Sequence, residues 1–452
     1  MRSKVVAHNI IPVGLEEKTV SFRVHKSMRT EAMLWVCLFS YVTITIFCTA
    51  YGEPTPSVAR TEYLRRLNEA TLRTIESPDG DVVHCVDRAK QPAFDHPLLS
   101  DHVLQESPTS IPEGLEDLNA KNLSMLENSN STARPSTIFG TQLWHSQGRC
   151  PEDTVPIRRP SDSDLLDRQH QTRSYRRLNY TASSKRNLSR KLMGNFAMPV
   201  HEYAVGQIDH TSIYGTYAIF NAWNPKVQDP EEMSIAQLWL ISGSFYGPYL
   251  DTVEAGWTVE PDAYKDYNTR FFIYWTNDNY KTSGCRDLHC PGFVHVSRDM
   301  LLGGTISPLS KYGGQQFEMQ PVAVWKDNVT GNWWLRVGST NIGYWPARLF
   351  KNGLQNKASI AQWGGEITNM FAKGRHTSTQ MGSGHFSTEG GGNAAYVRSL
   401  QYVDSTYSFV SVPKNFRFAA SNPTCYSITP YSTTYSGTSF FFGGPGYNPQ
   451  CH

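Results

Sequence analysis

The stretch Val253-Glu254-Ala255-Gly256-Trp257-Thr258-Val259 decides the fold class. Its apolar side chains alternate with Glu254, Gly256 and Thr258. This period of two predicts a β-strand over residues 251–259 with one apolar face. Burial of that face places Glu254 on the other face, where Gly256 leaves room beside the carboxylate. We therefore expect Glu254 on the concave side of a curved sheet, in a cleft.

The same alternation continues through the chain after residue 195. Residues 271–276 and 333–337 repeat the period of two, and Gly, Asn and Pro separate the other candidate strands. Those candidates are residues 215–223, 234–242, 292–297, 316–326, 358–367, 379–386 and 394–403. So many short strands predict an all-β domain built as a closed or stacked antiparallel sheet.

A second glutamate lies in the segment Trp363-Gly364-Gly365-Glu366. It is the only acidic residue between Asp327 and Glu389, which argues against a solvated run of charges. A neighbouring tryptophan is an apolar wall that excludes water and raises the pKa of a carboxyl group. Of two such acids, one accepts a proton from water while the other donates to the leaving group. The alternative is that Glu254 and Glu366 cap loops or pair with arginine.

Other chemistries find less support in the sequence. The chain has no Gly-x-Ser-x-Gly elbow, no zinc-protease helix motif, no phosphate loop and no dinucleotide fingerprint. A formal charge of +2 without a strongly basic face argues against nucleic acid as a partner. We interpret residues 379–386 as a polar strand that lines the cleft. The predicted substrate contacts are Trp257, Trp363, Gln380 and Ser383. The histidines of the later part are scattered singly, and we expect them to lie at the surface or to be satisfied internal groups, not metal ligands. They include His201, His210, His289, His295 and His376.

Residues 33–50 form an apolar segment that follows a basic stretch. This order predicts a secretory signal, with true initiation at Met28 as one option, and therefore a protein with no stable membrane insertion after cleavage. A signal anchor is the competing interpretation, because about 18 apolar residues lie near the lower limit for crossing a bilayer. We expect an extracellular or other acidic secretory location.

Cysteines and glycosylation sequons agree with secretion. Two of the eight cysteines leave with the signal, and sequence order suggests Cys85 with Cys150, Cys285 with Cys290 and Cys425 with Cys451. Six cysteines nevertheless allow about fifteen connectivities. A metal knuckle at residues 285–290 is disfavoured because no second pair follows it. The Asn-x-Ser/Thr sequons lie at Asn122, Asn130, Asn179, Asn187 and Asn328.

Composition changes near residue 195, from polar and poor in aromatic residues to rich in tryptophan, tyrosine and glycine. We predict an accessory part with a helix over residues 62–76, then a basic connector exposed to proteases, then the catalytic part. An ordinary linker that stays intact is the alternative for the connector. The predicted domains are a leader at 1–52, an activation peptide at 53–170, a processing linker at 171–194 and a catalytic domain at 195–452.

The chain resembles the neprosin-like glutamic peptidases, a plant family of secreted proteins with an activation peptide and a peptidase domain. Residues 80–87, 91–99 and 148–151 are similar to the activation-peptide signature. The peptidase motifs that match lie at 201–206, 223–225, 254–275, 331–335, 342–346, 363–366, 380–384 and 442–451. The chain departs from the family in its long amino-terminal extension and in residues 107–135, a low-complexity stretch.

Membership would imply a β-sandwich catalytic domain, Glu254 and Glu366 as the catalytic pair, cleavage after proline in acid, and no metal or organic cofactor. We therefore expect a zymogen whose smaller, mixed α+β activation peptide acts as an intramolecular inhibitor. Protonation of Asp81, Asp87 and Asp95 is expected to weaken its docking. The rival functions are a glycoside hydrolase and a non-catalytic wall or carbohydrate-binding protein.

Overall fold

The computed structural model describes residues 56–120, 136–137, 142–160, 199–245, 247–281, 283–371, 374–433 and 436–452. The predicted signal, the basic connector and four of the five sequons lie outside these residues. Asn328 is described and is exposed, in the turn that follows a buried strand. Within the described ranges, no helix has the length and apolar character needed to cross a membrane.

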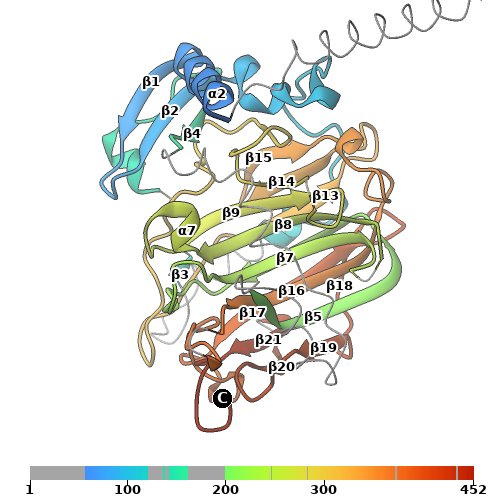
Figure 1. The fold of residues 1–452 in the computed structure, drawn as a ribbon. Coiled ribbons are helices and arrows are strands. Elements are labelled where there is room, and N and C mark those ends of the chain that lie inside the picture. The colour runs from blue at the N-terminus through green and yellow to red at the C-terminus, as the bar shows by residue number, and fades with distance from the viewer. Residues whose placement is uncertain are drawn as a thin grey trace, which may run out of the picture. The chain divides into compact units, whose positions relative to one another are not determined.

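The accessory part combines several helical segments with a small sheet (Figure 1). The helix α2, Pro56–Ala70, leads into an antiparallel sheet with the order β1-β2-β4. The prediction of a helix over 62–76 is wrong in its second half, because β1 begins at Thr71. The Thr71 hydroxyl donates a 2.6 Å hydrogen bond to the Leu67 carbonyl at the helix end, and residues 71–76 pair with β2. Pairing along the whole segment outweighs its weak helical pattern.

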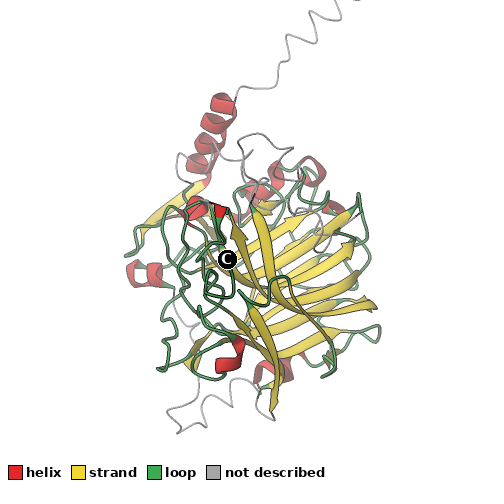
Figure 2. Ribbon diagram, turned by 60° about the horizontal axis from the view of Figure 1, so that its bottom comes forward, coloured by secondary structure: helices red, strands yellow, loops and turns green. Residues whose placement is uncertain are grey.

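Residues 199–452 are mainly strands, with helices short and few (Figure 2). One sheet has the order β10-β9-β8-β7-β16-β5-β19, and the other has β11-β15-β14-β13-β6-β17-β21-β20 with β18 paired to β17. The all-β antiparallel prediction is confirmed, as is the smaller mixed part before it. The strands are β1 Thr71–Glu76, β2 Val82–Asp87, β3 Ser136–Thr137, β4 Thr154–Arg158, β5 Val200–Ile213, β6 Gly215–Phe220, β7 Ser234–Gly243, β8 Leu250–Val259, β9 Arg270–Thr276, β10 Cys285–Arg286, β11 Val294–His295, β12 Phe317–Glu318, β13 Val322–Lys326, β14 Trp333–Val337, β15 Thr340–Trp345, β16 Ala358–Asn369, β17 Ala395–Val403, β18 Phe409–Ser411, β19 Arg417–Ala420, β20 Ser427–Thr433 and β21 Gly437–Gly443. The short helices are α7 Pro261–Tyr264, η1 Arg88–Lys90, η2 Pro92–Asp95, η3 Pro97–Leu99, η4 Leu143–Gln147, η6 Ala347–Leu349 and η8 Ser387–Glu389.

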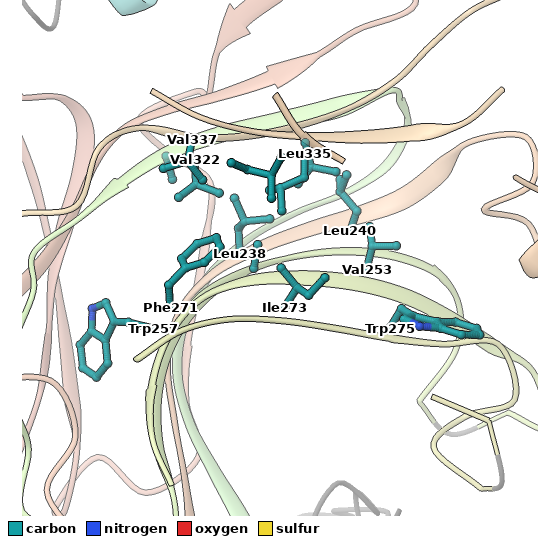
Figure 3. Packing of buried hydrophobic residues seen from close by; sticks show 14 of the residues in the cluster. Leu238, Leu240, Val253, Trp257, Phe271, Ile273, Trp275, Val322, Leu335 and Val337 are labelled. Carbon is teal, nitrogen blue, oxygen red and sulfur yellow. The ribbon is translucent and has the colours of Figure 1, made fainter. Parts of the chain in front are cut away.

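The main core lies between the two large sheets. Figure 3 shows Leu238, Leu240 and Val253 from the first sheet near Leu335 and Val337 from the second. Each of these side chains is fully buried. The alternation that predicted strands therefore also sets which side chains of β7, β8 and β9 enter this core.

Several predicted strands differ from the observed ones. Residues 379–386 form turns because Gly382 and Gly384 have φ of 65° and 81°, which a strand does not accept. Residues 316–326 divide into β12 and β13, with Pro321 between them. Alternation did not reveal β5, or β19 to β21 near the carboxyl end.

The three predicted disulfides are present. Cys85 bonds to Cys150, Cys285 to Cys290, and Cys425 to Cys451. The first joins β2 to the segment just before β4, and the last ties the carboxyl end to the turn before β20. Sequence order was therefore sufficient to pair them.

Candidate active site

Glu254 and Glu366 lie on the same face of one sheet. Glu254 is on β8 and Glu366 on β16, the two strands that flank β7. The register opposes Glu254 to Trp239 and Glu366 to Ile235, and directly opposed residues project from the same face. Neighbouring residues such as Val253 enter the core between the sheets (Figure 3). We call the other side, which carries both glutamates, the glutamate face.

The two glutamates lie diagonally across β7. Their opposed residues, Trp239 and Ile235, are four positions apart on that strand. This offset is about 13 Å along the strand and about 10 Å across two strand spacings. Gln237 lies midway between them, with Gly256 opposed on one side and Gly364 on the other. The two glutamates therefore lie on either side of a strip that carries a single side chain, that of Gln237.

Glu254 is surrounded by hydroxyl donors and is only 1% exposed. The Thr252 hydroxyl donates a 2.8 Å hydrogen bond to Glu254 Oε1, and the Tyr280 hydroxyl donates one of 2.5 Å to the same oxygen. Tyr274 is opposed to Glu254 on β9, and burial together with the charge of Glu254 raises the pKa of Tyr274 far above its usual value. Tyr274 therefore stays a neutral phenol next to this carboxyl group.

Glu366 has a different partner, the imidazole of His201. His201 Nδ1 lies 2.5 Å from Glu366 Oε1, with both side chains 3% exposed. His201 is on β5, two residues from Tyr203, which is directly opposed to Glu366. His201 is thus an internal histidine, one of the two alternatives predicted for it, and its partner is a candidate catalytic carboxylate. The signal that could have found it was an extended strand at 200–213, since pairing with β16 brings residue 201 beside residue 366.

The glycines next to the glutamates are required by the backbone. A Cβ at Gly256 would lie 2.1 Å from the Ala236 carbonyl oxygen, and one at Gly364 would lie 2.2 Å from that of Ala204. Gly364 also has φ of 141°. No other residue can occupy either position without moving a neighbouring strand. The glycines thus let the strands approach closely and leave Gln237 as the one side chain on the strip between the glutamates.

Trp257 and Trp363 do not line the glutamate face, which corrects the prediction that they contact substrate. Both are fully buried between the sheets. Trp257 donates to the Asn221 carbonyl at 3.0 Å, and Trp363 donates to the Thr216 hydroxyl at 2.9 Å. Alternation along a strand places a residue at an odd distance from a glutamate on the opposite face. The apolar neighbours of the glutamates are instead Trp239, Ile235 and Phe272.

Gln380 and Ser383 belong to the turn that replaces the predicted polar strand. Gln380 Oε1 accepts a 3.0 Å hydrogen bond from the Lys226 amide, and Ser383 Oγ accepts one of 3.3 Å from the His385 amide. Both side chains therefore hold loops together, and the structure brings neither into contact with the glutamates.

A second buried acid cluster surrounds His376. His376 Nε2 lies 2.9 Å from Glu202 Oε1, and Nδ1 lies 2.7 Å from the Thr377 carbonyl oxygen. Both partners are acceptors, so the ring fits this position as an imidazolium with a proton on each nitrogen. Among the described residues, one group has metal-ligand proximity, namely His376 with Cys425 and Cys451, but the disulfide occupies both sulfurs. The cluster is therefore not a metal centre.

The His376 cluster predicts a pH-dependent stability. Burial alone would lower the pKa of His376, but the bond and charge of Glu202, with Glu232 nearby, raise it. A raised pKa stabilises the folded state below about pH 6.5, the unfolded value, and this contribution is lost as the pH rises through the folded pKa. We expect His376→Gln to lower the unfolding temperature by a few degrees near pH 5 and by less near pH 9. The control is His385→Gln, because His385 is partly exposed and pairs with Glu389. An equal loss at both pH values would contradict this account.

Two known family models match this chain. A family model described as Neprosin matches residues 230–445, and one described as Neprosin activation peptide matches residues 74–207. The two matches place the chain among peptidases that carry their own activation peptide. It belongs to the neprosin family, and the resemblance seen in the sequence is confirmed.

Solved structures show only distant similarity, at 8% identity in each case. Scytalido-glutamic peptidase with a peptide-based transition-state analogue aligns over 55% of this chain and 99% of its own, with a TM-score of 0.29. SCP-B, a member of the Eqolisin family of peptidases, covers 54% of this chain and 98% of its own, with a TM-score of 0.28. A homodimeric agglutinin from chicken liver covers 35% and 92%, with a TM-score of 0.20.

Proposed function

We propose that the protein is a secreted, acid-active glutamic endopeptidase that cleaves after proline, with Glu254 and Glu366 activating one water molecule. The observation that carries the proposal is the pair of buried glutamates on one face, separated by the strip of Gly256, Gln237 and Gly364. A peptide backbone lying on that strip would pass between the two carboxyl groups. The aromatic side chains of Trp239, Tyr274 and Phe272 supply apolar surface suited to a proline ring.

The hydrogen-bond partners support opposite roles for the two acids. His201 Nδ1 lies 2.5 Å from Glu366 Oε1, and an N–H donated to a carboxylate oxygen favours the ionised form of that carboxylate. Glu254 accepts from two neutral hydroxyls, an arrangement also open to a protonated carboxyl group. Glu366 thus takes a proton from water as the water oxygen bonds to the carbonyl carbon. Glu254 then gives its proton to the nitrogen as the C–N bond breaks.

The activation peptide is the proposed inhibitor of this site. In the full chain Glu254 and Glu366 are 1% and 2% exposed, a degree of burial expected of a latent enzyme. The described residues of the activation peptide contact the peptidase part through many polar groups. Gln91 exchanges two hydrogen bonds with the His295 backbone, at 2.9 and 2.8 Å, and Asp327 accepts from the Thr109 amide at 2.6 Å.

Of the three aspartates expected to respond to acid, one bridges to the peptidase part. Asp81 pairs with Arg270 at 2.6 Å and with Arg158 at 2.8 Å. Arg270 is opposed to Thr258 and so belongs to the sheet that carries the glutamates. Asp87 caps the helix η1, and Asp95 pairs with Arg66 of the activation peptide itself. Asp81 is therefore the one of these three aspartates whose side chain pairs with the peptidase part.

Removing the Asp81 charge should release the activation peptide more easily. Breaking one partner of a buried ion pair costs about 3–5 kcal/mol, which here weakens docking. We expect the Asp81→Asn precursor to activate at a higher pH than wild type, measured as self-cleavage and activity against pH. The control is Asp95→Asn, which should activate at the wild-type pH. A precursor with Asp81→Asn and an unchanged pH profile would show that docking does not depend on this pair.

Acidifying the purified precursor and identifying the bonds it cuts tests the proposed function. Proline-containing peptides and cell-wall polysaccharides are assayed side by side, and cleavage sites are read by mass spectrometry. Cuts after proline support the proposal, whereas sugar release without peptide cleavage would favour a glycoside hydrolase. If neither peptide cleavage nor sugar release is detected at any pH, even after complete removal of residues 1–194, the result would favour a non-catalytic binding protein. Secretion is tested by expressing the full chain and analysing Asn328, which is exposed, for the N-linked glycan that passage through the secretory pathway would add.

A further inference from the structure

Gln237 is the one side chain on the strip between the two glutamates. It lies on β7, opposed to Gly256 on β8 and to Gly364 on β16. Its side chain is fully buried. Gln237 Nε2 lies 3.4 Å from Glu366 Oε2, a long hydrogen bond, and this contact assigns the amide nitrogen to the Glu366 side.

The other end of the Gln237 carboxamide is unsatisfied. In the part of the chain that the structure describes, the buried Oε1 atom has no hydrogen-bond partner. A buried acceptor without a donor costs free energy, and native proteins retain such groups mainly where a ligand or water satisfies them. The same residue therefore contacts one glutamate through its nitrogen, and its oxygen is left to accept a hydrogen bond on the strip between the two glutamates.

We propose that Gln237 is a further catalytic residue, whose Oε1 accepts the N–H of the scissile peptide bond. This assignment rests on the proposed peptidase function of the glutamates. A peptide backbone on the strip offers N–H donors, and the bond that follows a proline carries one on its nitrogen. Accepting that N–H fixes the plane of the peptide group, so that the nitrogen lone pair formed on attack points away from Gln237. The carbonyl carbon then faces the water on Glu366, and the nitrogen can take the proton of Glu254.

An ester analogue isolates this contact. In a depsipeptide the scissile N–H is replaced by oxygen, so nothing remains for Gln237 Oε1 to accept. We compare wild type with Gln237→Met, which keeps the length of the side chain and loses both polar atoms. The matched substrates are a proline-containing peptide and its ester. We expect kcat/KM for the peptide to fall about 10- to 100-fold, the effect of one buried hydrogen bond, and kcat/KM for the ester to change by less than about threefold.

The outcomes separate this inference from the proposed function. Equal losses on peptide and ester would mean that Gln237 acts only through Glu366 or through folding, and would overturn the inference. Full peptide activity in Gln237→Met would also overturn the inference. If Glu366→Gln is inactive in the same assay, the proposed role of the glutamate pair is still supported. If Glu366→Gln and Glu254→Gln both keep wild-type activity, the proposed function itself fails. Thermal unfolding of Gln237→Met, expected within a few degrees of wild type, shows that the variant is folded.

Discussion

Replacing Glu366 with Gln is expected to lower kcat at least about 1000-fold at the acid optimum, a loss of about 4 kcal/mol of transition-state stabilisation. The carboxylate next to His201 is the proposed base, and an amide cannot take a proton from water. Gln has nearly the same shape, so its effect reports chemistry more than packing. Glu254→Gln should be similarly inactive, because it removes the proton for the leaving nitrogen. Single-turnover cleavage of a proline-containing peptide measures both.

Matched variants make this result interpretable. Glu231→Gln removes a carboxylate from an exposed position of the same domain and should keep full activity. The two site variants should be secreted, and they should unfold close to the wild-type temperature. Activity within tenfold of wild type in either variant would remove that glutamate from the proposed chemistry.

Introducing a methyl group at Gly364 or Gly256 is expected to be among the most damaging small changes in the protein. The new Cβ would meet a backbone carbonyl oxygen at 2.2 Å or 2.1 Å, and a paired strand cannot yield locally. We expect Gly364→Ala and Gly256→Ala to lose about 3–5 kcal/mol of folding stability, the range of severe core defects. Secretion yield and thermal unfolding measure the loss.

Gly391→Ala is the corresponding control. A Cβ at Gly391 would meet no atom within 4 Å, so its substitution should leave stability within about 0.5 kcal/mol of wild type. Wild-type stability in Gly364→Ala would contradict the close strand approach described above.

Alternation along single strands made much of this architecture predictable. It predicts Glu254 on the face opposite Val253 and Ala255. The glycine and tryptophan residues around Glu254 and Glu366 predict both as candidate catalytic acids. Alternation could not give the register between strands, and register alone brings His201 to Glu366 and Gln237 between the two acids. The neighbouring sequence also predicted that tryptophan forms an apolar wall beside each glutamate. Because side chains alternate between the two faces of a strand, Trp257 and Trp363 instead point into the core.

The start of β5 sets a boundary for maturation. This strand begins at Val200, one residue before the histidine that contacts Glu366, and the basic connector ends only a short distance upstream. A cut at the end of the connector, after residue 194, would leave six residues before His201. Trimming by exopeptidases that went a few residues further would remove this imidazole while leaving both acids in place. The working lifetime of the enzyme would then be governed by how firmly its first strand resists fraying.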